Sequence, residues 1–113
     1  MKMIEERKIS ETLLRLSVPA NNYGFKYLKL AVMLADVDEN YLHSVMRLYA
    51  DVARECGTTP QKAEKGIRYA VEQAYMYGDI KIIEALGETD PDTGKLAAGR
   101  FIGALCEYLK YES

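Results

Sequence analysis

The sequence predicts an all-α fold, a compact array of about six to seven helices that contains a central helix-turn-helix. Apolar residues recur at steps of three and four along nearly the whole chain, which is the spacing of amphipathic helices. Helix-forming Met, Leu, Ala, Glu and Lys are plentiful, and only three prolines occur among 113 residues. No segment has a convincing strand pattern. We therefore expect one helical domain over residues 1–113.

Two helices are expected before residue 36. The first ends near Val18-Pro19, because the residue before a proline disfavours the helical conformation, and it turns three residues inward: Ile9, Leu13 and Leu16. Asn22 is a candidate N-cap for the second helix. That helix covers residues 23–35 and is apolar on nearly every side, which is typical of the buried centre of a bundle.

Residues 36–38 are expected to end the second helix. A third helix should then turn four residues inward: Leu42, Val45, Met46 and Tyr49. A short helix over residues 49–56 follows, and Gly57 closes it as a C-cap. Thr59 is well suited as the N-cap of the next helix, and Pro60 is well suited to its first position.

That helix is expected to run to Tyr77 and to stop at Gly78-Asp79. A short helix over residues 80–86 and an irregular segment over residues 87–94 come next. A last helix carries apolar residues at regular helical steps: Ala98, Phe101, Ile102, Leu105 and Leu109.

Residues 48–77 have the pattern of a helix-turn-helix, which needs a short helix, a tight turn and a longer amphipathic helix. Ala53 is the small residue that lets the two helices cross closely, and Gly57 is the turn glycine. On a helical wheel the second helix has one apolar arc, made of Ala63, Ile67, Ala70, Val71 and Ala74. The opposite arc is polar: Gln61, Lys65, Arg68, Tyr69 and Glu72.

The polar arc carries side chains that can read DNA bases. Arg and Lys donate to guanine, Gln pairs with adenine and Glu accepts from cytosine. Thr58 and Thr59, beside a helix N-terminus, suit phosphate contacts. An ordinary amphipathic helix with a solvated polar face fits the same pattern equally well. Gly66 costs such a helix about 1 kcal/mol relative to alanine, which a close approach to a neighbouring helix or to DNA would explain.

Composition limits the class of protein. A net charge of −2 and a pI near 5.4 argue against a general polyanion binder, although a local basic face is enough for DNA binding. The first residues are too charged for a signal peptide, and no apolar run approaches the length of a membrane span. We expect a cytoplasmic protein without membrane contact, in which Cys56 and Cys106 are buried free thiols.

Other candidate sites are weak. His43 is the only histidine, and no His, Cys or Asp cluster has the spacing of metal ligands. Residues 90–94 lack the residue order of a calcium loop. A glycine-rich phosphate loop and a nucleophile elbow are also missing from the sequence. We therefore expect no metal, no cofactor and no enzymatic activity.

Several segments together carry a family resemblance, and the most specific is the string over residues 58–72. The segments are 18–20, 24–28, Ala53, 58–59, 63–72, 78–80 and 101–102. In this order they resemble the C-terminal effector domains of stage-zero sporulation protein A, a family of sporulation response regulators. The resemblance covers residues 14–111.

The resemblance implies about six helices with the helix-turn-helix in the middle. It implies sequence-specific binding to short promoter elements in double-stranded DNA, head-to-tail pairing of two copies on tandem sites, and a contact with RNA polymerase. The base-reading roles of the family fall on Glu64, Lys65 and Arg68. Phosphate or flanking contacts fall on Thr58, Thr59, Gln61, Lys62 and Tyr69.

The sequence departs from the family pattern at several points. Lys65 stands where the family typically has Arg, and Tyr69 where it typically has His. Lys cannot form the bidentate fork of Arg, so we expect a changed base preference. The loop over residues 87–98 also differs, and the sequence contains no phosphoacceptor receiver domain. The acidic pI and the missing receiver domain keep a second hypothesis open, a protein–protein interaction module that keeps the fold without binding DNA.

Overall fold

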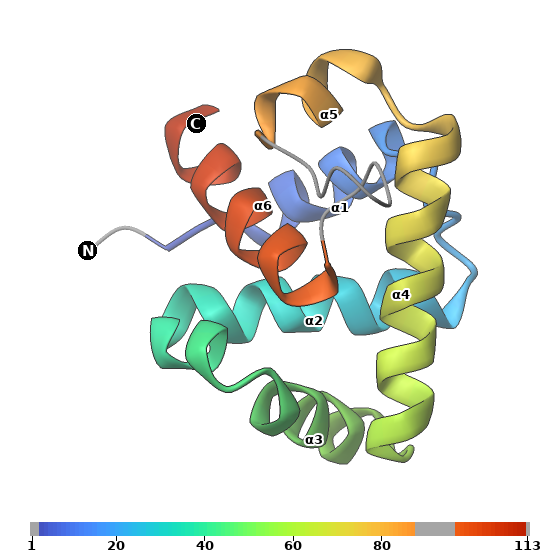
Figure 1. The fold of residues 1–113 in the computed structure, drawn as a ribbon, viewed down its shortest axis with the longest axis vertical. Helices are drawn as coiled ribbons and strands as arrows, with labels where there is room; N and C mark the ends of the chain where they lie inside the picture. The colour runs from blue at the N-terminus through green and yellow to red at the C-terminus, as the bar shows by residue number, and fades with distance from the viewer. Residues whose placement is uncertain (1–2, 88–96, 113) are drawn as a thin grey trace.

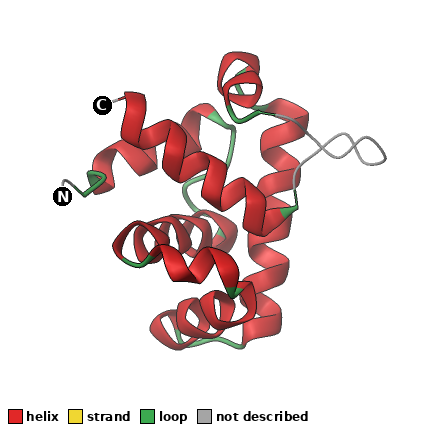
Figure 2. Cartoon of the chain, turned by 60° about the vertical axis from the view of Figure 1, so that its left-hand side comes forward, coloured by secondary structure: helices red, strands yellow, loops and turns green. Residues whose placement is uncertain are grey.

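The computed structural model describes residues 3–87 and 97–112, and it confirms the all-α prediction. This part of the chain folds into six α-helices and one 3₁₀ helix, η1 (Figures 1 and 2). In chain order they are α1 (Glu6–Arg15), α2 (Tyr23–Val37), η1 (Glu39–His43), α3 (Val45–Cys56), α4 (Pro60–Tyr77), α5 (Ile80–Ala85) and α6 (Ala98–Glu112).

Helix α2 is the centre of the fold, as its apolar pattern predicts. It packs against α1, η1, α3, α4 and α6, and α4 crosses it near its N-terminus (Figure 1). The predicted N-cap is confirmed, because the Asn22 side chain accepts a hydrogen bond of 2.7 Å from the Gly24 N–H. Seven residues of α2 are buried: Gly24, Phe25, Tyr27, Leu28, Ala31, Val32 and Ala35.

The prediction for residues 39–56 is wrong in two respects. The chain forms the short η1, breaks at Ser44 and then runs without interruption through α3, whereas we expected a boundary near Tyr49. Met46 is 75% exposed, although it was expected to point inward. Because the chain breaks at Ser44, the helical periodicity of η1 does not continue into α3. The buried face of α3 includes Leu48, Tyr49 and Val52, and Met46 lies outside this face.

The junction between α4 and α5 is held against the end of α1 by a hydrogen bond and an ion pair. Ser17 has a positive φ of 62°, and its hydroxyl donates a hydrogen bond of 2.8 Å to the Tyr77 carbonyl at the end of α4. The Arg15 guanidinium forms an ion pair of 2.8 Å with Asp79, whose carboxylate also caps α5 at the Lys81 N–H. These contacts fix the end of α4 and the start of α5 at Gly78-Asp79, where the sequence predicts the change of helix.

Helix α6 completes the core. Its predicted apolar row is confirmed, with Ala98 partly buried at the first turn and four residues fully inside: Phe101, Ile102, Leu105 and Leu109. Cys106 is buried beside them as a free thiol, as expected, whereas Cys56 is only half-buried. The predicted irregular segment over residues 87–94 falls outside the described residues beyond Gly87. Of the helices in residues 3–87 and 97–112, none has both the length and the apolar character needed to cross a bilayer.

Candidate nucleic-acid interface

The turn between α3 and α4 has the geometry that the sequence predicts. Gly57 adopts the left-handed conformation with φ of 66°, and the Thr58 N–H donates to the Ala53 carbonyl across 2.9 Å. This is the Schellman arrangement that satisfies the end of a helix. The Thr59 hydroxyl accepts a hydrogen bond of 3.2 Å from the Lys62 N–H, and Pro60 occupies the first turn of α4. A three-residue link, Gly57 to Thr59, therefore directs α4 away from α3.

Small residues bring α4 close to its neighbours. Its predicted apolar arc is buried completely: Ala63, Ile67, Ala70, Val71 and Ala74. Ala53 of α3 is also buried, as predicted. These residues fix the rotation of α4 about its own axis. The polar arc therefore faces outward, with Gln61, Lys65, Arg68 and Tyr69 exposed and Glu72 half-buried.

On the side facing α3, the polar arc carries an ion pair. The Arg68 Nη1 and Glu64 Oε1 atoms lie 3.4 Å apart, one helical turn from each other. Tyr49 of α3 lines the same hollow as Glu64. Burial and then the Glu64 charge raise the pKa of the Tyr49 phenol, and the Arg68 charge opposes that rise. A hollow of about 160 Å³ is lined here by Met46, Tyr49, Pro60, Gln61 and Glu64.

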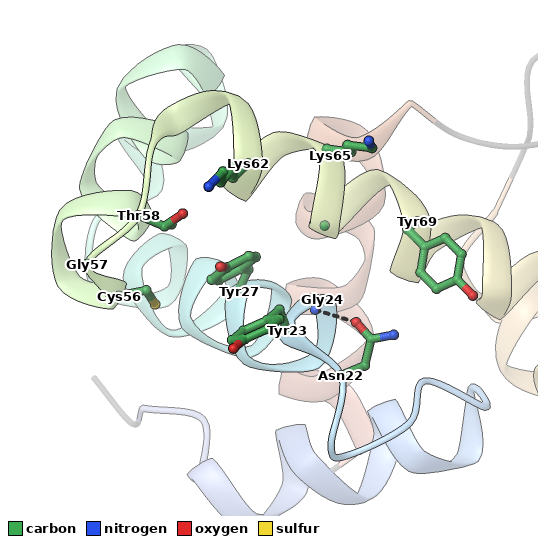
Figure 3. Close-up of a pocket in the computed structure, with 11 residues that line it drawn as sticks. Asn22, Tyr23, Gly24, Tyr27, Cys56, Gly57, Thr58, Lys62, Lys65 and Tyr69 are labelled. Atoms are coloured by element: carbon green, nitrogen blue, oxygen red, sulfur yellow. Dashed lines mark hydrogen bonds between the residues drawn. The ribbon is translucent and has the colours of Figure 1, made fainter.

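On the side facing α2, the arc borders a longer groove of about 620 Å³ (Figure 3). The α4 wall contributes Lys62, Lys65, Gly66 and Tyr69, and the turn contributes Cys56, Gly57 and Thr58. The opposite wall belongs to α2 and its cap: Asn22, Tyr23, Gly24 and Tyr27. The polar face of α4 thus lies between a small hollow and a larger groove.

The α2 wall of this groove does not follow from the sequence pattern. Residues 22–27 are far from the helix-turn-helix in the sequence, and we interpreted them only as a cap and a buried helix. The available signal was the pair Tyr23 and Tyr27, one turn apart at the start of that helix. Their rings stack with centroids 6.1 Å apart, so the exposed Tyr23 ring rests on the buried Tyr27 ring.

The other sequence candidates lie elsewhere. His43 is exposed at the end of η1. Over residues 3–87 and 97–112, no three His, Cys, Asp or Glu side chains gather as metal ligands. Residues 90–94, considered for calcium, fall outside the part that the structure describes.

Comparison with known families agrees with the all-α fold and with the α3–α4 motif. The model of the family described as "Sporulation initiation factor Spo0A C terminal" matches residues 9–109. The match runs from α1 to the last turns of α6, and it includes the whole helix-turn-helix. The chain belongs to the family of the C-terminal domain of sporulation initiation factor Spo0A, the DNA-binding effector domain of a sporulation response regulator.

Proposed function

We propose that this domain is a sequence-specific, DNA-binding transcriptional regulator that places α4 in the major groove and acts in the cytoplasm. The observation that carries the proposal is the outward polar face of α4, presented by a tight turn from α3. An α-helix with its side chains is about 10–12 Å wide, and the major groove is about 12 Å wide, so such a face can reach base edges.

Glu64, Lys65 and Arg68 are the proposed base-reading residues. Lys65 lies opposite the buried arc and is exposed, and Arg68 is exposed about one turn later. Glu64 is half-buried and holds the Arg68 guanidinium in an ion pair. Glu64 therefore has two roles in this proposal, since it can accept from a base and it limits the directions that Arg68 can take.

The start of α4 supplies the proposed backbone contacts. Thr58, Thr59 and Lys62 lie at or beside its N-terminus, where peptide N–H groups and the helix dipole favour phosphate. Gln61 and Tyr69 flank the base-reading residues on the exposed arc. The family also suggests a second copy bound head to tail on tandem sites and a contact with RNA polymerase as partners.

Selection of preferred sites from a random duplex pool, followed by titration of Arg68→Ala, tests the proposal. The variant should bind the selected site about 1–3 kcal/mol more weakly and should lose preference at one position. Lys81→Gln, an exposed substitution on α5, is the control and should leave the preference unchanged. Wild-type affinity of Arg68→Ala for the selected site would refute the proposed docking.

A protein–protein interaction module is the second candidate, and one surface feature favours it. Met76, Tyr77 and Ile80 are 63–65% exposed within five residues at the end of α4 and the start of α5. Apolar groups exposed together often mark a protein contact. This candidate predicts no salt dependence in a duplex titration, whereas DNA binding predicts a linear fall of log affinity with log salt.

A further inference from the structure

The α2–α4 groove differs in charge from the rest of the protein. Eleven residues line it, and they include Lys62 and Lys65 but no Asp or Glu. The chain as a whole carries 17 acidic and 15 basic residues. Within the described part of the chain, neither lysine has an ion-pair partner, whereas Glu64 and Arg68 on the same helix neutralise each other. The groove is therefore a local cationic surface on an acidic protein.

The shape of the groove is fixed from beneath. A Cβ atom on Gly66 would lie 2.7 Å from the Tyr27 ring, so that ring occupies the space that a side chain on α4 would fill. Tyr23 stacks on Tyr27 and is 75% exposed. The exposed Tyr23 ring is thus held in place on the α2 wall, and in Figure 3 the Tyr27 ring is drawn between it and Lys62.

Polar groups on the α2 wall can donate hydrogen bonds to an anion. The Tyr23 hydroxyl lies on the exposed ring, and phenols are among the groups that contact DNA phosphates. Asn22 uses Oδ1 to cap α2 at the Gly24 N–H, so its Nδ2 group is the end that can donate (Figure 3). On the other side of the groove, α4 supplies the Lys62 ammonium group and the turn supplies the Thr58 hydroxyl.

The proposed position of α4 in the major groove indicates what would occupy the α2–α4 groove. A helix that fills the major groove leaves one sugar-phosphate strand on each side of itself. On the α2 side of α4, the groove follows the helix from Lys62 to Tyr69, a rise of about 10 Å. Because one DNA strand carries a charge about every 3.4 Å of helix axis, a length of about 10 Å corresponds to about three phosphates.

We propose that the α2–α4 groove seats one DNA backbone strand, and that Tyr23 and Asn22 of α2 contact phosphates opposite Lys62. This inference rests on the proposed function, and it adds a DNA contact outside the helix-turn-helix. It also assigns Asn22, Tyr23 and Lys62 to the sugar-phosphate backbone, so these three residues set affinity for all sequences equally.

The first test is a fluorescence titration of the whole chain against a selected duplex and a random duplex at several salt concentrations. Tyr23→Phe keeps the ring stack and removes only the hydroxyl, and it should weaken binding to both duplexes by the same factor, about three- to tenfold. Lys62→Gln should reduce the salt slope by about one. Tyr111→Phe and Lys81→Gln, exposed on α6 and α5, are matched controls and should bind as wild type does.

A second test locates the strand. Duplexes with a neutral methylphosphonate at successive positions should show one position at which Lys62→Gln causes no further loss of affinity. Tyr23→Phe should show the same non-additivity at that position or the next one. Saturating duplex should also slow the alkylation of Cys56, which lines the end of the groove near the turn.

The outcomes separate this inference from the proposed function. Salt-dependent binding by the wild type, with unchanged binding by Tyr23→Phe and Lys62→Gln, overturns the groove inference and leaves the proposed function standing. A change of sequence preference in Tyr23→Phe overturns the backbone assignment, because phosphate contacts carry no sequence information. Absence of salt-dependent binding by the wild type overturns the proposed function, and the groove inference with it.

Discussion

Gly24 of α2 and Gly66 of α4 face each other where the two helices cross. A Cβ atom on Gly24 would lie 2.5 Å from the Gly66 carbonyl oxygen, and a Cβ atom on Gly66 would lie 2.7 Å from the Tyr27 ring. The sequence left two explanations for the helical glycine at position 66, approach to a neighbouring helix or to DNA. The structure shows approach to a neighbouring helix, and this approach builds the floor of the groove.

Gly24→Ala should destabilise the fold, because backbone rather than a flexible side chain occupies the space of the new Cβ. We expect a loss of about 1–3 kcal/mol in the free energy of unfolding, as for an overpacked core, measured by urea denaturation. Gly103→Ala in α6 is the matched control. Its Cβ would lie 3.5 Å from Leu42, an ordinary contact, so we expect a gain of up to about 1 kcal/mol. Equal effects of the two substitutions would contradict the close crossing.

Alanine substitutions of Thr58 and Thr59 should affect different properties, DNA affinity for Thr58 and stability for Thr59. The Thr59 hydroxyl caps α4, so Thr59→Ala should reduce the free energy of unfolding by about 1 kcal/mol. Thr58 lines the groove, and the cap of α4 is formed by Thr59 instead, so Thr58→Ala should change stability less and affinity for duplex DNA more. Chemical denaturation and duplex titration of both variants measure the difference. The prediction fails if Thr58→Ala is the more destabilised variant.

The Arg15–Asp79 ion pair should make stability depend on pH. The hydrogen bond from Arg15 and then the one from the Lys81 N–H lower the pKa of Asp79 below its ordinary value. A carboxylate with a lowered folded-state pKa stabilises the fold above the unfolded pKa, about 3.9, and this stabilisation is lost as pH falls through the folded value. Asp79→Asn retains an oxygen that can cap α5, so it isolates the charge.

The difference in unfolding midpoint between wild type and Asp79→Asn should therefore be constant near neutral pH and shrink below about pH 4. Thermal unfolding at a series of pH values measures it. Repeating the comparison in an Arg15→Gln background should abolish most of the difference, since Arg15 is the largest cause of the shift. A difference that persists below pH 3 in the original background would assign the effect to the cap.

Glu64→Gln should change affinity and specificity in opposite directions. Removing the carboxylate releases Arg68 and takes a negative charge away from the DNA-facing side, so affinity for random duplex should rise. Discrimination for the selected site should fall by about 1–3 kcal/mol, the range for one well-formed base contact. Titration against both duplexes gives the ratio. Glu84→Gln, exposed on α5, is the control and should leave this affinity ratio unchanged. An unchanged ratio in Glu64→Gln would show that Glu64 neither reads bases nor orients Arg68.

The two cysteines should differ in reactivity. Burial raises the pKa of the Cys106 thiol to about 12, so only about one molecule in ten thousand carries the thiolate at pH 8. Cys56 is half-buried and lines the groove. Native protein treated with iodoacetamide at pH 8 should therefore gain one adduct by mass spectrometry, and Cys56→Ser should gain none. Two adducts formed at similar rates would contradict the burial of Cys106.

Local patterns in the sequence determined most of the helices, three of their caps and the buried face of α4. The caps at Asn22, Gly57 and Thr59 use hydrogen bonds between residues a few positions apart. Such bonds depend only on neighbouring side chains, and so they can be predicted from sequence. The buried arc of α4 follows in the same way from helical periodicity. Periodicity failed at Met46, because the break at Ser44 interrupts the count that it depends on.

Tertiary structure alone decided what lies on each side of α4. The sequence shows Glu64, Lys65 and Arg68 as one polar face, but the packing against α3 places Glu64 in a hollow with Tyr49, where Glu64 forms an ion pair with Arg68. The approach of residues 22–27 to α4 joins segments about 40 positions apart. No local rule encodes that distance, because it depends on two glycines that each leave room for the other helix. The helix-turn-helix was therefore predictable, whereas the groove beside it was not.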